Sequence, residues 1–223
     1  MEFQNLSRHY DNNFKGIEKL KWLPWVGESY NRSKTIVIGE SQYEDGDEWQ
    51  EENINATRIL IDKRFLGDRG RLYDNVEKVL LNLENPTLEQ GNHLWKSVSY
   101  MNLVQRLMSS KKERPNDSDF DTGWSVFLKV AGILRPSTCI VLGKASCGRL
   151  GYYLNNHDLS WERSNVQEFY TTDKVINLKQ DSHTLKLIFI NHPSGSYGFS
   201  CERWGKFISD NEPSLRSLLM DVE

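Results

Sequence analysis

The segment 35–43, which reads T-I-V-I-G-E-S-Q-Y, constrains the fold of this chain more than any other. Its β-branched apolar run suits a strand buried on both faces, as the central strands of a parallel sheet are. Gly39 is expected to end that strand. Because ligands of open α/β sheets bind just beyond the carboxyl ends of the strands, the next residues are candidates for a functional site. Those residues are Glu40, Ser41, Gln42 and Tyr43.

Three later segments repeat this arrangement of an apolar strand followed by polar or small residues. Residues 98–101 are expected to form a strand that ends at Asn102, and residues 138–142 form another that enters Gly143. The last, 186–190, leads into N-H-P-S-G-S, which contains His192. The pattern predicts an α/β protein in which these strand ends meet at one cleft.

The remaining segments are predicted from helical spacing and from loop composition. An amphipathic pattern and the breakers that follow it predict helices over 72–83 and 124–134. Two further helices are expected over 14–22 and 201–208. The polar stretch 109–122 is expected to be a loop, and 149–177 shows no pattern that assigns it.

Length and composition indicate one globular domain over residues 1–223. Of the 223 residues, 38% are apolar and 26% charged, which suits a single good core. No apolar run approaches the roughly eighteen residues of a membrane helix, and the first ten residues hold no signal-peptide core. We therefore expect a cytoplasmic protein with no membrane partner.

Charge and cysteine content exclude some classes of site. The three cysteines, Cys139, Cys147 and Cys201, show no C-x-x-C spacing, which argues against a disulfide framework or a structural zinc site. A net charge of -3 gives no global attraction to nucleic acid, so such binding needs a local basic surface. The acidic segment 44–52 would repel a phosphate backbone unless it lies to one side.

Nucleotide-binding motifs are missing after the predicted strands. Gly143-Lys144 lacks the earlier glycine of a P-loop, and Ala145 stands where the hydroxyl would be. No G-x-G-x-x-G follows a strand, so a dinucleotide fold has no support.

Several candidates have two readings when each is taken alone. Glu40 suits a surface loop acid, and His192 a capped or core histidine, but both are expected at the end of a buried strand, which favours a shared site. Asn102 suits a turn or the reading of an amide-like ring edge. The basic segment 63–71 with Phe65 suits either a solvated connection or a loop that holds a phosphate while a base stacks.

Taken together, the motifs resemble the uracil-DNA glycosylase superfamily. They are V-I-G-E-S-Q-Y, M-N, I-V-L-G-K-A and H-P-S-G-S-Y-G-F-S-C-E-R-W-G-K-F, in the family's order over roughly residues 34–208. The resemblance implies a three-layer α/β/α sandwich with a central, mostly parallel four-stranded sheet. It also implies a monomer that acts on single- or double-stranded DNA with no metal or redox cofactor.

The resemblance also implies roles for individual residues. Glu40 matches the carboxylate of the branch with glutamate directly after the glycine, whereas Ser41 falls where the best-known uracil enzymes have aspartate. His192 matches the histidine that donates to the base carbonyl. Residues matching the base pocket are Gly39, Gln42, Tyr43, Phe65 and Asn102. Residues expected at the DNA backbone are Ser194, Gly195, Ser196, Tyr197, Arg203 and Lys206; Ser196 replaces the family's wedge leucine, leaving Tyr197 or Phe199 to wedge.

Three functions follow as hypotheses. The first is a monofunctional DNA glycosylase that flips out uracil or a modified base, as superfamily members that defend bacteria against modified phage DNA do, and leaves an abasic site. The second is a serine hydrolase with Ser41 as nucleophile and His192 as base, although Tyr43 stands where a nucleophile elbow needs glycine. The third is a DNA-binding module that keeps the base pocket and has lost turnover.

Overall fold

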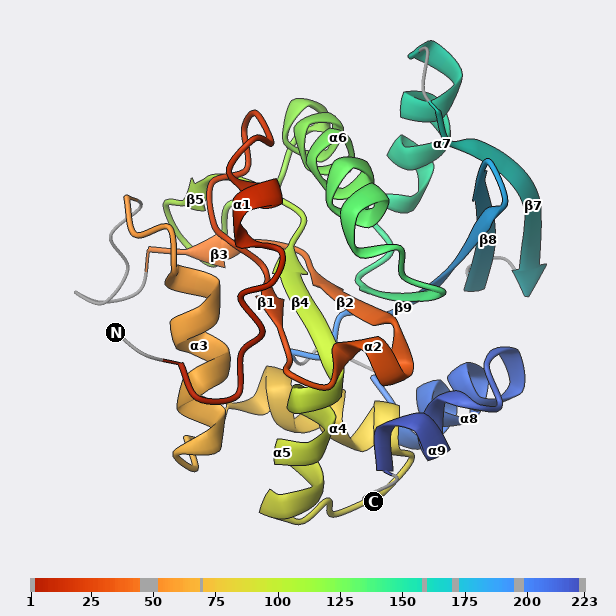
Figure 1. The fold of residues 1–223 in the computed structure, drawn as a ribbon. Coiled ribbons are helices and arrows are strands. Elements are labelled where there is room, and N and C mark those ends of the chain that lie inside the picture. The colour runs from red at the N-terminus through yellow and green to blue at the C-terminus, as the bar shows by residue number, and fades with distance from the viewer. Residues whose placement is uncertain are drawn as a thin grey trace.

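The computed structural model of the chain describes residues 3–44, 52–68, 70–157, 160–169, 173–194 and 199–220. Within these ranges the chain folds around one seven-stranded mixed sheet, in the order β1-β4-β2-β6-β9-β8-β7 (Figure 1). In that order the strands are Trp25–Val26, Val98–Asn102, Thr35–Gly39, Thr138–Leu142, His183–Ile190, Asp173–Gln180 and Glu162–Phe169.

The four central strands, β4, β2, β6 and β9, are parallel. Their register pairs Gly39 with Asn102 at the carboxyl ends of β2 and β4. The outer pairings, β1 with β4 and β7 with β8 with β9, are antiparallel. The α/β class and the parallel centre are confirmed, but a sheet of four strands is wrong. Strand β7 and most of β8 come from the segment 149–177, which showed no assignable pattern, and β1 has only two residues.

A second, two-stranded sheet lies after the carboxyl ends of the central strands. It pairs β3 (Gln42–Tyr43) with β5 (Leu107–Met108) in parallel. The chain after Gly39 is also held from the β4 side, because the carbonyls of Gly39 and Glu40 accept hydrogen bonds of 2.9 Å from the backbone N–H groups of Leu103 and Val104. These bonds fix the backbone that carries Glu40.

Helices cover both faces of the main sheet (Figure 1). Side chains alternate along β2, so that Ile36 and Ile38 pack on one face and Val37 on the other. The first face is covered by α1 (Asp11–Phe14), α2 (Tyr30–Ser33), α6 (Asp117–Leu134) and α7 (Cys147–Asn156). The second is covered by α3 (Ala56–Phe65), α4 (Arg71–Leu81), α5 (Leu88–Ser97), α8 (Cys201–Asn211) and α9 (Leu215–Met220).

Of the predicted helices, two are confirmed, one begins earlier than expected and one is wrong. The helices expected over 72–83 and 201–208 are confirmed as α4 and α8. The helix expected from 124 begins earlier, at Asp117, because Asn116 and Asp119 form a capping box. The helix over 14–22 is wrong, since α1 ends at Phe14. No helix in the described part of the chain is long and apolar enough to cross a membrane.

Candidate functional site

A cavity of about 520 Å³ opens where the central strands β2, β4 and β9 end. Seven residues that were predicted from the sequence line it: Glu40, Ser41, Gln42, Tyr43, Asn102, His192 and Ser194. Six lining residues were not predicted: Leu60, Leu72, Tyr73, Tyr100, Lys111 and Arg114. Side chains from distant parts of the sequence therefore meet in one cavity, as the motif order implied.

Glu40 and His192 face each other across Gly143, which follows the intervening strand β6. A Cβ placed on Gly143 would lie 3.2 Å from Oε2 of Glu40 and 3.6 Å from Cδ2 of His192. Gly143 also has a φ of +112°, a conformation that side chains rarely adopt. Glycine at this position keeps open the space between the carboxylate and the imidazole.

His192 is held as a neutral ring with its proton on the outer nitrogen. The backbone N–H of Ser194 donates to Nδ1 at 3.3 Å, and the Ser194 hydroxyl lies 2.8 Å from the same atom. A backbone N–H can only donate, so Nδ1 accepts and Nε2 carries the proton. Burial lowers the pKa of His192, and the charge of Arg114 lowers it further. The ring is therefore a donor at neutral pH.

Burial shifts the pKa of Glu40 in the direction opposite to that of His192. Burial raises its pKa above the ordinary 4.5, and the charge of Arg114 acts against that rise. A carboxylate in partly dry surroundings interacts strongly with any positive charge that develops beside it.

Asn102 is fixed by hydrogen bonds on both sides of its amide. The Tyr100 hydroxyl donates to its Oδ1 at 3.0 Å, and its Nδ2 donates to Oε1 of Gln42 at 3.4 Å. The side chain packs directly over Gly39, where a Cβ would lie 2.2 Å from Oδ1 of Asn102. Gly39 is thus required for the amide to reach the cavity.

Ser41 does not form the pair that a serine hydrolase needs. Its Oγ is buried and has no hydrogen-bond partner within the described residues. His192 instead pairs with Ser194, two residues along the chain. The geometry gives no support to Ser41 as a nucleophile activated by His192.

Phe65 lies away from this cavity. It packs at the end of α3 against Trp25, with ring centroids 5.6 Å apart, and lines a separate hollow with Leu66 and Asn92. Tyr73, in the first turn of α4, is an aromatic residue that does line the cavity and that packs on the same face of the sheet as Phe65. The sequence offered a helical pattern for α4 but no signal for which of its faces meets the cavity.

Tyr73 rests on a buried charged network. Its ring lies 5.8 Å from Trp95 and 5.6 Å from the Arg64 guanidinium. Arg64 in turn forms ion pairs with Glu77 at 2.7 Å and Asp74 at 2.8 Å, and Trp95 Nε1 donates to Glu77 at 2.9 Å. This network holds the Tyr73 ring in place.

The residues predicted at the DNA backbone divide into three groups. Ser194 lines the cavity, while Gly195, Ser196 and Tyr197 lie outside the described residues. Arg203 and Lys206 are on α8 and do not line the cavity: the Arg203 guanidinium lies 4.8 Å from the Trp204 ring, and Lys206 pairs with Asp210 at 2.9 Å.

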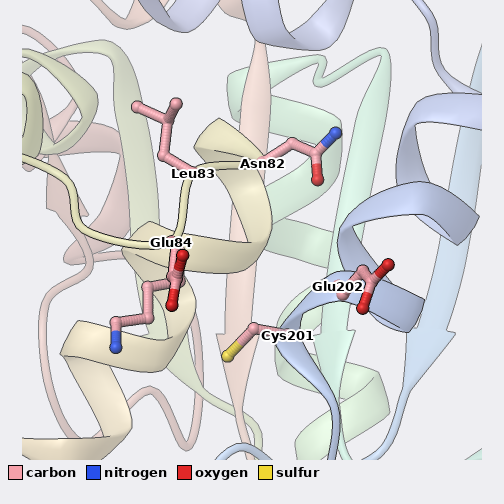
Figure 2. Close-up of a pocket in the computed structure, with 6 residues that line it drawn as sticks. Asn82, Leu83, Glu84, Cys201 and Glu202 are labelled. Atoms are coloured by element: carbon pink, nitrogen blue, oxygen red, sulfur yellow. The ribbon is translucent and has the colours of Figure 1, made fainter.

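A second cavity of about 490 Å³ lies between the end of α4 and the first turn of α8 (Figure 2). Its described lining is Lys78, Asn82, Leu83, Glu84, Cys201 and Glu202, none of which was predicted as a site residue. Within the ranges that the structure describes, no group of three or more His, Cys, Asp or Glu side chains is placed to hold a metal ion.

Comparison with protein-family models and with curated proteins finds no match to this chain.

Proposed function

We propose that the chain is a monofunctional DNA glycosylase that hydrolyses the bond between a flipped-out base and its sugar. The observation that carries the proposal is the approach of Glu40 and His192 to one point beside Gly143, inside one cavity at the strand ends. The arrangement of helices on both faces of a parallel centre supports the finer fold assignment, a three-layer sandwich of the uracil-DNA glycosylase type.

The two side chains suit the two charges that develop when the glycosidic bond breaks. The sugar becomes positive, and the carboxylate of Glu40 stabilises it and polarises the attacking water. The departing base becomes negative, and the Nε2–H of His192 donates to its carbonyl oxygen. Both groups are held by burial and by backbone contacts before the substrate arrives, so little reorganisation is needed during the reaction.

The rest of the cavity suits recognition of a base taken out of the stack. Tyr73 lines the cavity and is the ring we assign to stacking in place of Phe65, and the amides of Asn102 and Gln42 offer donors and acceptors at a base edge. Extruding the base costs a few kcal/mol, which these contacts repay. The substrate in this proposal is uracil or a modified base in single- or double-stranded DNA, bound by a monomer.

A binding module without turnover is the second candidate. Ser41 stands where the best-known uracil enzymes have aspartate, and its buried hydroxyl has no partner within the described residues, so it is not arranged as an acid or base. Such a module would keep the pocket and lose the chemistry.

The experiment is base release from oligonucleotides carrying uracil, hypoxanthine, xanthine or hydroxymethylated or glucosylated cytosine. Alkali-labile abasic sites that disappear in Glu40→Gln and His192→Ala would support the glycosylase and name its base. Lys129→Gln, an exposed change on α6 outside the cavity lining, is the matched control. If no base is released from any oligonucleotide but DNA is bound, the result would favour the binding module. If no base is released and DNA is not bound, both candidates would be overturned.

A further inference from the structure

The loop between β5 and α6, residues 109–116, brings two cations to the cavity. Lys111 and Arg114 both line it and both are exposed, so they stand at its rim, whereas Asn102 lies buried inside. Groups at the rim of a base pocket meet the sugar and phosphate of a bound nucleotide. Buried groups meet its base.

This loop is fixed by its own hydrogen bonds. The Glu113 carboxylate accepts from the backbone N–H of Ser109 at 2.6 Å and from its hydroxyl at 2.8 Å, and it pairs with Arg106 at 2.8 Å. Arg106 also pairs with Asp119 at 2.7 Å. The acid next to Arg114 in the sequence is therefore engaged inside the loop.

The end of the loop is equally fixed. Asn116 caps α6 and accepts from the backbone N–H of Asp119 at 3.0 Å, while Asp119 accepts from the backbone N–H of Asn116 at 2.9 Å. A loop held at both ends loses little conformational freedom when a ligand binds. Lys111 and Arg114 are therefore carried at the rim by a loop that is already ordered before a ligand binds.

Arg114 also acts on the catalytic pair through its charge. It lowers the pKa of His192 and opposes the burial that raises the pKa of Glu40. Arg114 also lines the same cavity as Glu40 and His192, so its guanidinium can reach a nucleotide whose base enters that cavity. Its planar fork of donors matches two oxygens of a phosphate.

We propose that residues 109–116 form a phosphate-binding loop, in which Arg114, with Lys111, binds the phosphodiester next to the nucleotide whose base enters the cavity. This inference rests on the proposed function and names the residues that would hold the backbone of its DNA substrate. The contact also aligns the glycosidic bond between Glu40 and His192, because it fixes the sugar from the backbone side.

Oligonucleotide binding tests the loop without requiring catalysis. The probe is a short single-stranded oligonucleotide with a tetrahydrofuran abasic site, titrated against wild type, Arg114→Gln, Lys111→Gln and the control Lys129→Gln at several salt concentrations. Each lost phosphate contact should reduce the slope of log K against log salt by about 0.7. We expect that reduction, with roughly tenfold weaker binding, for Arg114→Gln, and a smaller loss of the same kind for Lys111→Gln. Lys129→Gln, an exposed change on α6 outside the loop and the cavity lining, should match wild type.

A neutral methylphosphonate beside the abasic site then identifies the phosphate. If Arg114 binds that group, the methylphosphonate and Arg114→Gln each weaken binding and together weaken it no further. Additive losses at both flanking positions, or an unchanged salt slope in Arg114→Gln, would overturn the loop proposal.

These outcomes separate the loop from the proposed function. Wild-type base release with an unchanged slope in Arg114→Gln overturns only the loop. If Arg114→Gln has a reduced salt slope but the wild-type protein releases no base from any substrate, the loop proposal stands and the glycosylase proposal is overturned. A wild-type protein that does not bind the probe overturns both.

Discussion

Glu40 and His192 come from the ends of β2 and β9 and approach the same point from opposite sides, at 3.2 Å and 3.6 Å from where a Gly143 Cβ would lie. The strand between them, β6, contributes no side chain there because it ends at a glycine. The space between the two side chains is thus left open by a residue that has no Cβ.

Replacing Gly143 tests this relationship. Gly143→Ala should lower base release about tenfold to a hundredfold, because the methyl group crowds Oε2 of Glu40 at 3.2 Å and fills the space beside His192, in a geometry in which small shifts matter. Gly67→Ala is the matched control: Gly67 also has a positive φ, +84°, but a Cβ there meets nothing within 4 Å. Both variants should lose roughly 1–2 kcal/mol of stability in urea unfolding. Equal activity in the two would contradict the proposed spacing.

Base release should fall in acid as Glu40 gains a proton and His192 becomes charged. Burial raises the pKa of Glu40 above 4.5 and lowers the pKa of His192 below 6.5, so kcat/KM should have an acid limb set by these two groups. Arg114 lowers the pKa of both groups, and its removal therefore raises both. Arg114→Gln should move the acid limb to higher pH in a profile of kcat/KM. A limb that stays in place or moves lower would show that Arg114 does not act on the pair.

Stability should respond to Glu40 in the sense opposite to activity. Because burial raises the folded-state pKa, the ionised form is disfavoured by folding, and this cost grows as pH rises through that pKa. Glu40→Gln should unfold at a higher urea concentration than wild type at neutral pH, and the gain should vanish below pH 4.5. Glu18→Gln, at an exposed position, is the control. A Glu40→Gln protein less stable at neutral pH would contradict the burial cost.

Tyr73 and Phe65 should separate binding from stability. Tyr73→Leu should weaken substrate binding roughly tenfold, within the range that base stacking on an aromatic ring contributes. Phe65→Leu should cost about 1 kcal/mol of stability through its contact with Trp25 and leave KM unchanged. The measurements are KM for base release and urea unfolding. A raised KM in Phe65→Leu alone would return the stacking role to Phe65.

The central strands were predictable because buried parallel strands carry local signals. Segments 36–38, 98–101, 138–142 and 186–190 each show an apolar run that ends at a small or polar residue, and all lie in strands of the sheet. The β7–β8 hairpin was not predictable, since Glu162–Phe169 and Asp173–Gln180 are rich in polar residues and lack the apolar run. Helix α5, Leu88–Ser97, was missed because its capping box at Thr87 and Gln90 was not recognised.

Among the site residues, too, those that follow a buried strand were predictable and the others were not. Glu40, Asn102 and His192 follow predictable strands, so the topology places them together. Tyr73 and Arg114 were missed because a helix face and a loop position depend on tertiary packing, which no local spacing reports. Phe65 was misplaced for the same reason, since the basic segment around it gave no sign that its ring turns to Trp25.

The buried ion pair between Arg64 and Glu77 joins the last turn of α3 to the middle of α4. Opening either helix alone would strand a charge in an apolar surrounding, a penalty of several kcal/mol. The amide hydrogens of both helices should therefore exchange with solvent as one cooperative unit, and Tyr73 should keep its orientation until that unit opens.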